Sequence, residues 1–222
     1  MNNAARTPGL FLAFEGPDGS GKSTQAAALA AALTARGVPV HLTREPGGTP
    51  LGERLRSLVL TADDGPVDER TEALLFAAAR ATHATQLIRP CLAAGTTVVT
   101  DRYIDSSVAY QGHGRGLGAA WIAELNAWAT DGLVPDLTIV LDIDAAQAAA
   151  RRTAREDASG AGPDRMEQSL AHAHETLRGA FLEAAQAAPE RYLVLDATTE
   201  SEQLAEQILD AVLALAAERT AS

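Results

Sequence analysis

A glycine-rich segment that holds one lysine constrains this chain more than any other feature. Residues 16–23 read Gly-Pro-Asp-Gly-Ser-Gly-Lys-Ser, which fits the pattern G-x-x-x-x-G-K-S of phosphate-binding loops. An apolar run, Leu10–Phe14, precedes it, and an alanine-rich segment typical of a helix follows it. The glycines therefore lie between a buried strand and a helix start, where backbone N–H groups and the helix dipole favour an anion. The alternative, a chance glycine-rich turn, does not explain why motif and flanks agree.

Lysine usage supports the same interpretation. Lys22 is the only lysine, whereas the other 17 of the 18 basic side chains are arginine. An ammonium group is a compact charge, and a guanidinium is a wide planar fork. A loop that wraps a phosphate has room for the first. The lone lysine also excludes a protein kinase, which needs a lysine on a separate strand, and a Schiff-base enzyme, which needs a second lysine.

Apolar runs and the helical segments between them predict the fold. Five runs resemble buried strands: Leu10–Phe14, Val38–Leu42, Thr96–Thr100, Leu137–Leu141 and Tyr192–Leu195. Strands that alternate with helices indicate βαβ units and a parallel sheet. We expect an α/β fold in one domain over residues 1–222, with a five-stranded parallel sheet flanked by helices and a mobile lid near residues 151–165. Residues 67–92 are alanine-rich and predict one long helix packed on both sides.

Charge and composition exclude several classes of partner. The net charge of −11 disfavours nucleic-acid binding, which depends on basic patches, so we expect small-molecule nucleotides as ligands. A single cysteine cannot form an internal disulfide and fits a reducing compartment. No apolar stretch reaches 18 residues, so we expect no membrane span. Together these features predict a cytoplasmic protein.

The loop predicts the chemistry at its own end of the site. Lys22 should reach the β- and γ-phosphates of a bound triphosphate, and the Ser23 hydroxyl should ligate Mg²⁺. Asp101 ends the predicted strand Thr96–Thr100, where a carboxylate can hold the metal directly or through water. The alternative is that Asp101 caps the helix that follows.

Three arginines outside the loop are candidates for an acceptor pocket: Arg56, Arg80 and Arg102. Taken singly, each could be a surface or ion-pair arginine. Phe76 and Arg80 are four residues apart and share a helix face, where a ring could stack on a base while a guanidinium bonds its edge. The alternative is a core phenylalanine with an exposed arginine. No His-Arg-Asp general-base motif occurs, which suits a phosphate monoester acceptor because its second pKa is about 6.

Several segments together resemble bacterial thymidylate kinases over nearly the whole chain. The loop alone marks only a superfamily. The specific segments, in chain order, are Thr-Arg-Glu-Pro-Gly-Gly-Thr at 43–49, Leu-Arg-Ser-Leu at 55–58, Leu-Phe-Ala-Ala-Ala-Arg at 75–80, Asp-Arg-Tyr at 101–103, Ala-Tyr-Gln-Gly at 109–112, Pro-Asp-Leu-Thr at 135–138 and Asp-Arg-Met-Glu at 164–167. The resemblance implies a P-loop nucleoside monophosphate kinase that uses ATP and Mg²⁺ to convert dTMP to dTDP, and it implies a homodimer.

The resemblance also implies roles for individual residues. ATP would bind the loop residues Gly16, Pro17, Asp18, Gly19, Ser20, Gly21, Lys22, Ser23 and Thr24. Asp18 would bond the sugar 3′-hydroxyl, Arg56 and Arg102 would hold the acceptor phosphate, and Phe76 and Arg80 would contact thymine. Ser107, Tyr110 and Gln111 would line the sugar and base, with Tyr110 crowding a ribose 2′-hydroxyl.

A catalytic arginine is expected from the lid, because the loop carries no basic residue other than Lys22. The cluster Arg151, Arg152 and Arg155 fits that role, with Arg155 preferred and then Arg152, alongside Lys22 and Arg102 as catalytic residues. A solvated helix face is the alternative.

Two other functions stay open at this point. One is a kinase for another monophosphate, such as UMP or dUMP. The other, of a different class, is a non-catalytic nucleotide-binding or ATP-driven partner module.

Overall fold

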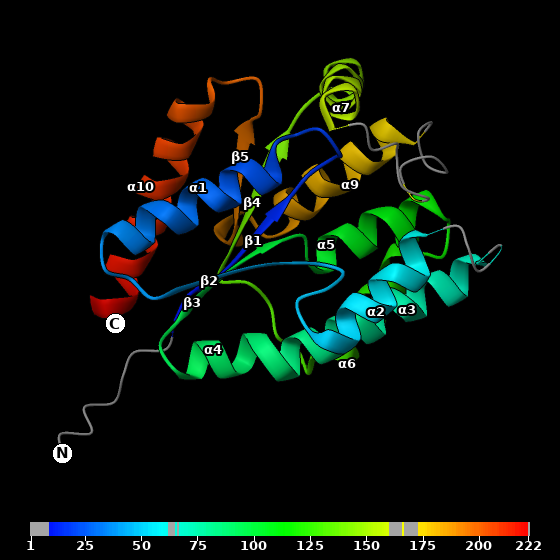
Figure 1. Ribbon diagram of the computed structural model, residues 1–222, viewed down its shortest axis with the longest axis horizontal. Helices are drawn as coiled ribbons and strands as arrows, with labels where there is room; N and C mark the ends of the chain where they lie inside the picture. The colour runs from blue at the N-terminus through cyan, green and yellow to red at the C-terminus, as the bar shows by residue number, and fades with distance from the viewer. Residues whose placement is uncertain (1–8, 62–64, 66, 160–165, 167–172, 222) are drawn as a thin grey trace.

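The protein is described here by a computed structural model. It covers residues 9–61, 65, 67–159, 166 and 173–221, and for residues 155–159 and 221 it describes the backbone only. The sheet contains β1 (Phe11–Glu15), β2 (Val40–Arg44), β3 (Thr97–Asp101), β4 (Leu137–Asp142) and β5 (Tyr192–Asp196). All pairings are parallel, in the order β2-β3-β1-β4-β5 (Figure 1). The expected α/β fold with five parallel strands is confirmed.

Helices cover both faces of the sheet. They are α1 (Lys22–Ala35), α2 (Pro50–Leu60), α3 (Glu69–His83), α4 (Arg89–Ala93), α5 (Ile104–Ser107), α6 (Ala119–Thr130), α7 (Ala145–Ser159), α9 (His174–Ala187) and α10 (Ser201–Ala221). Two π-helical segments, η1 (Ala84–Ile88) and η2 (Val108–Gly114), and one 3₁₀ turn, η3 (Pro189–Arg191), complete the described elements. No helix within the described ranges is long and apolar enough to cross a membrane.

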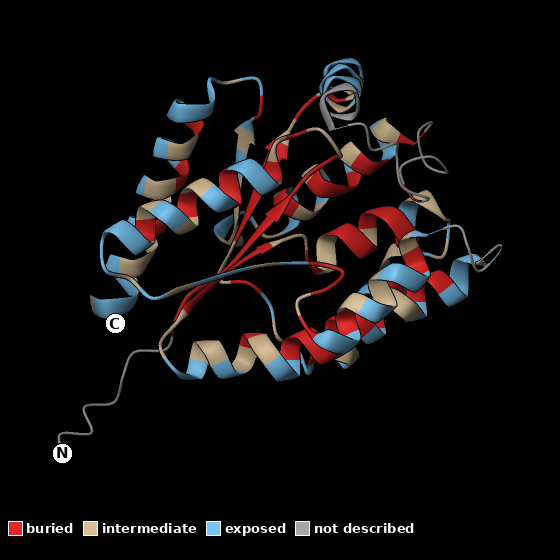
Figure 2. Cartoon of the chain, in the orientation of Figure 1, coloured by how far each residue is buried: buried red, intermediate tan, exposed pale blue. Residues whose placement is uncertain are grey.

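Alternation along β1 explains the two hydrophobic layers. Leu12 and Phe14 are fully buried against one side, in a cluster that includes Leu29 of α1 and Ile208 of α10. Phe11 is buried against the opposite face in a separate cluster. The central strands are therefore buried on both faces, as a parallel sheet with helices on each side requires (Figure 2).

The long helix expected over residues 67–92 is corrected in one respect. It is helical from Glu69 to Ala93, but it passes through the π-helical turn η1 between α3 and α4. Pro90 lacks an N–H group and its ring crowds the preceding turn, which accounts for the wider winding before it. Its first part, α3, packs against both α2 and α6, as expected, although Leu74 on α3 is 54% exposed.

Candidate active site

The loop between β1 and α1 adopts a conformation that requires glycine at two close approaches. A Cβ on Gly16 would lie 2.5 Å from the Leu141 carbonyl oxygen, and one on Gly19 would lie 2.5 Å from that of Ala148. Both glycines have positive φ angles, of 133° and 89°. No side chain caps the start of α1, so its first turn faces the loop, as an anion site requires.

Lys22 is the first residue of α1 and is folded back into the loop. Its Nζ donates to the Gly16 carbonyl oxygen at 2.9 Å and to the Pro17 carbonyl oxygen at 2.8 Å. The side chain is buried, and this burial, reinforced by the nearby Arg102 charge, lowers the pKa of Lys22 to about 8. Asp18 and Asp101 act in the opposite direction. The ammonium is therefore short of compensating negative charge.

Ser23 and Asp101 lie together at the carboxyl edge of the sheet. The Ser23 hydroxyl donates to Asp101 Oδ2, and Asp101 Oδ1 is buried without a hydrogen-bond partner. The following helix, α5, has Tyr103 at its N-cap and no side-chain capping bond. The alternative role of Asp101 as a helix cap is therefore wrong.

Arg102 joins the phosphate loop to η2. Its Nη1 donates to Ser106 Oγ at 2.9 Å, and its Nη2 donates to Asp18. The Tyr110 hydroxyl donates to the other Asp18 oxygen at 2.7 Å, and the guanidinium lies 5.2 Å from the centroid of the Tyr110 ring. Burial raises the pKa of Asp18, but the charges of Arg102 and Lys22 and these hydrogen bonds outweigh it and hold that pKa well below its usual range.

The Arg102 backbone is itself held in an uncommon conformation. Its φ angle of 72° lies in the left-handed region, which residues other than glycine rarely adopt. Its N–H donates to the Phe14 carbonyl oxygen at 2.9 Å, and its own carbonyl accepts from Thr100 Oγ1 at 3.0 Å. Neighbouring structure thus fixes the direction in which the guanidinium leaves the strand.

Arg80 is the most enclosed of the three candidate arginines. It is 2% exposed and donates to Glu45 Oε2 at 2.6 Å, Ser107 Oγ at 2.9 Å, the Tyr103 carbonyl oxygen at 2.9 Å and Asn126 Oδ1. The alternative of an exposed arginine behind a core phenylalanine is therefore wrong. Arg56 Nη1 donates to the Pro46 carbonyl oxygen at 2.9 Å, and Phe76 is half-buried beside Tyr110 and Met166.

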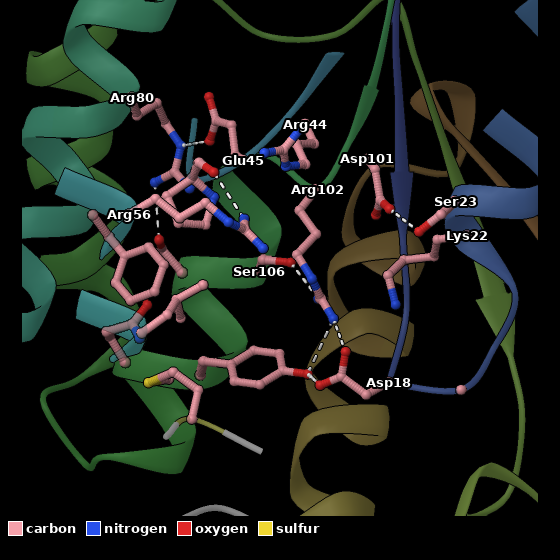
Figure 3. A pocket seen from close by; sticks show the side chains of 18 of the residues that line it. Asp18, Lys22, Ser23, Arg44, Glu45, Arg56, Arg80, Asp101, Arg102 and Ser106 are labelled. Atoms are coloured by element: carbon pink, nitrogen blue, oxygen red, sulfur yellow. Dashed lines mark hydrogen bonds and ion pairs between the residues drawn. The ribbon is translucent and has the colours of Figure 1, made fainter. Parts of the chain in front are cut away.

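One cavity of about 660 Å³ brings the two predicted ends of the site together (Figure 3). It is lined by these predicted residues: Asp18, Gly19, Gly21, Lys22, Ser23, Thr24, Arg56, Phe76, Arg80, Asp101, Arg102, Ser107, Tyr110 and Gln111. The loop lysine and all three candidate arginines therefore line one open cavity. Gly16, Pro17 and Ser20 belong to the loop but do not line this cavity.

Two of the three lid arginines have described side chains, and they point in different directions. Arg151 of α7 lines the cavity, whereas the Arg152 guanidinium lies 3.0 Å from His174 Nε2 on α9. Successive helical residues point about 100° apart, so the two cannot face the same way. Arg155 is in α7, but its side chain lies outside the described residues, as does the remainder of the expected lid over 160–165.

Sequence reasoning assigned no role to several residues of the site. Arg44, Glu45, Pro46, Leu60, Ser106 and Met166 also line the cavity. Glu45 forms a buried ion pair with Arg80 and lies 2.8 Å from His83 Nδ1. Glu15 accepts from Tyr103 N, Ser106 N and Ser106 Oγ, and burial, with Asp105 nearby, raises the pKa of Glu15 to about 7. A charged residue at the end of an apolar strand was the available signal for Glu15, whereas Glu45 stood only within the Thr-Arg-Glu-Pro-Gly-Gly-Thr segment.

Comparisons with known proteins agree with this geometry. A family model described as thymidylate kinase matches residues 14–208. A thymidylate kinase of Clavibacter sepedonicus is 51% identical over 200 residues, which cover 90% of this chain and 92% of that protein. One of Cutibacterium acnes is 44% identical over 207 residues, covering 93% and 98%.

A solved structure gives the same result in three dimensions. The crystal structure of thymidylate kinase from Ehrlichia chaffeensis superposes with a TM-score of 0.73 at 33% identity, covering 93% of this chain and 100% of that one. The sequence motifs, the cavity and these relatives lead to one conclusion: the chain belongs to the thymidylate kinase family.

Proposed function

We infer that this protein is a dTMP kinase, which transfers the γ-phosphoryl group of ATP to dTMP and forms dTDP for deoxythymidine nucleotide synthesis. The observation that carries the proposal is the shared cavity, because Lys22 and the three arginines Arg56, Arg80 and Arg102 line it together. Hydrolysis needs only a held water, whereas a second cationic site facing the donor loop suits a second anion. The family match identifies that acceptor as dTMP.

Transfer in this site depends on positioning and charge. The acceptor phosphate is largely dianionic above its second pKa of about 6, so it attacks without a general base. Arg102 and Arg56 bind its oxygens. Lys22 binds the β- and γ-phosphates of ATP and stabilises the negative charge that develops between them. Asp18 lies between the two ends, bonded to Arg102 and Tyr110, and its carboxylate is placed to receive a sugar hydroxyl when Arg102 turns to the phosphate.

The donor set fits Mg²⁺. Asp101 Oδ1 is buried without a partner beside the Ser23 hydroxyl, and magnesium is commonly held by one carboxylate, a hydroxyl and substrate phosphates. Among the described residues there is no cluster of three or more acidic, histidine or cysteine side chains, so no all-protein cage is proposed. A bound ion supplies charge neutralisation between the β- and γ-phosphates.

Thymine recognition is assigned to the α3 face of the cavity. Phe76 offers a ring for stacking. Four of the five N–H groups of Arg80 donate hydrogen bonds to described residues. One Nη2–H is left to donate to a thymine carbonyl. Ser107, Tyr110 and Gln111 close the sugar and base side, with Tyr110 against the 2′ position.

The lid arginines complete the proposal. Arg151 lines the cavity and is the nearest described candidate for stabilising the transferred phosphoryl group. Arg152 and Arg155 stay predictions for a closed state, since hinge or lid motion can bring new residues to phosphates.

An acceptor titration tests the assignment. ADP release should be fastest with dTMP and low with UMP, and equal activity on UMP would defeat the thymidylate assignment. A non-catalytic nucleotide-binding module is excluded if dTMP and ATP each raise the melting temperature and ADP is released.

We also propose a cytoplasmic homodimer. Large apolar side chains are exposed on α3 and on the two helices that pack against it, α2 and α6: Leu51 and Leu58 on α2, Leu74 on α3, and Trp121 and Trp128 on α6. Exposed apolar side chains gathered in this way are typical of protein interfaces. Sedimentation velocity at micromolar concentration should give a dimer. The single free cysteine fits the reducing cytoplasm.

A further inference from the structure

Glu72 is a buried carboxylate beside the base pocket that no step above uses. It lies on α3 one helical turn before Phe76 and two turns before Arg80, so the three share a helix face. Its side chain is fully buried. Arg115 Nη2 donates to Glu72 Oε2 at 2.9 Å, and Arg115 Nε donates to Oε1 at 3.1 Å. Buried charges need such partners, and this ion pair keeps the carboxylate in place.

The same carboxylate fixes the orientation of a residue that lines the cavity. Gln111 Nε2 donates to Glu72 Oε1 at 3.0 Å, and Gln111 is 1% exposed. An amide has one end that only donates and one end that only accepts, whereas an ion-paired carboxylate only accepts. The NH₂ group must therefore face Glu72, and Oε1 is the polar end that Gln111 offers to the cavity.

We propose that Glu72 is a positioning residue that holds the Gln111 amide oxygen toward the base and so selects pyrimidines that carry an N3–H group. The inference rests on the proposed function and deepens it by naming how the base is chosen. Thymine and uracil present N3–H as a donor next to a carbonyl at C4. Cytosine presents a lone pair at N3 next to an amino group.

Arg80 reinforces this selection. Its remaining N–H donates to the C4 carbonyl of thymine, whereas the C4 amino group of cytosine would place hydrogens against the guanidinium. With cytosine, Gln111 Oε1 would likewise face the N3 lone pair, and two acceptors repel each other. A site built around a substrate N–H rejects an analogue that lacks it by about 10⁴-fold. Arg80 and Gln111 do not contact the 5-methyl group in this arrangement. We therefore expect both residues to accept dUMP and to reject dCMP.

Substitution of Glu72 by Gln separates positioning from packing. A glutamine at position 72 can donate or accept, so it permits the Gln111 amide to turn its NH₂ group toward the cavity and donate to cytosine N3. We expect the ratio of kcat/KM for dTMP over dCMP to fall by about 10- to 100-fold, the range that one buried hydrogen bond covers. The change should appear mainly in the KM of the nucleoside monophosphate, with the KM of ATP within about twofold.

The matched control is Arg115→Lys. It replaces the two guanidinium hydrogen bonds but keeps a cation beside Glu72, so the carboxylate stays charged and still accepts from Gln111. We expect a lower melting temperature and an unchanged dTMP-over-dCMP ratio. A ratio that falls equally in Arg115→Lys and Glu72→Gln would overturn the proposal, because general loosening of the pocket would then explain both.

A measurement on the wild-type protein covers the case in which Glu72→Gln does not fold. The side-chain NH₂ protons of Gln111, assigned by their loss in Gln111→Met, should keep the same NOE contacts to the Glu72 side-chain protons with and without dTMP, because the NH₂ group faces Glu72. Loss of these contacts when dTMP binds would place the NH₂ group on the base and refute the inference. Failure of the wild type to release ADP with dTMP refutes the proposed function, whereas an active wild type with an unchanged ratio in Glu72→Gln refutes only the role of Glu72.

Discussion

Proton uptake on ATP binding is the sharpest prediction from the phosphate loop. Without nucleotide, Lys22 is buried beside Arg102 and its pKa is lowered to about 8. The triphosphate brings several negative charges to the ammonium, which favours its charged form and raises that pKa again. ATP should therefore bind the protonated loop, and a deprotonated Lys22 should take up a proton from solvent.

The size of the effect follows from that pKa of about 8. At pH 9 about a tenth of the free protein carries the ammonium, so binding should take up about 0.9 proton per ATP, against about 0.1 proton at pH 7. Because the unprotonated fraction must be converted first, the apparent affinity should fall about tenfold between pH 7 and pH 9, or about 1.4 kcal/mol.

Calorimetry in two buffers of different ionisation enthalpy measures the proton directly. The terminal phosphate of ATP, with a pKa of about 6, is fully ionised at pH 9, so its own titration does not contribute where the predicted uptake is largest. Lys22→Met has no ammonium and should show no uptake at pH 9. Lys22→Arg keeps its charge at all these pH values and should also show none, while it binds ATP poorly because the wide guanidinium does not fit. Uptake below about 0.2 proton at pH 9 in the wild type would refute the reasoning.

Three further predictions concern the acceptor side and stability. Phe76→Ala should raise the KM for dTMP about tenfold or more through lost stacking and leave the KM for ATP within about twofold in steady-state assays; the reverse pattern would make Phe76 a core residue only. Tyr110→Phe removes the hydroxyl that donates to Asp18 at 2.7 Å and should lower kcat/KM for dTMP about tenfold, whereas unchanged kinetics would show that Arg102 alone orients the carboxylate. Burial raises the pKa of Glu15 from 4.5 to about 7, so its contribution to stability is fully present below about pH 4.5 and is lost as the pH rises to 7. Chemical denaturation should show the free energy of unfolding of the wild type falling relative to Glu15→Gln by about 3 kcal/mol over that interval, and parallel pH curves would contradict the shift.

The fold was largely predictable because its strands are buried on both faces. A strand such as β1 has to be continuously apolar, and this pattern is visible in Leu10–Phe14 from the sequence alone. Strand order could not be read in the same way, since it depends on which helix crosses which face. The π-helical turn before Pro90 was missed because a helix pattern records apolar spacing and not local winding.

The site was predictable where a sequence motif fixes the backbone conformation. It was less predictable where contacts between distant segments decide which way a side chain points. The loop and the strand-end Asp101 follow from their position in the chain. Glu72 was missed, because a charged residue on a helix reads as solvent-facing until a partner such as Arg115 is placed against it. The choice among the lid arginines stays a prediction, because sequence spacing alone does not show that Arg151 lines the cavity while Arg152 lies against His174. That one domain spans residues 1–222 stays a prediction.

The exposed face of α6 has a practical consequence. Both tryptophans of the chain, Trp121 and Trp128, lie on this helix, 50% and 83% exposed, and neither lines the nucleotide cavity. Intrinsic fluorescence of this protein therefore reports what covers α6, and a blue shift on raising the protein concentration marks association of subunits. Nucleotide titrations followed by the same signal will be nearly silent, so an external dye or a labelled ligand is the better optical probe for the catalytic cleft.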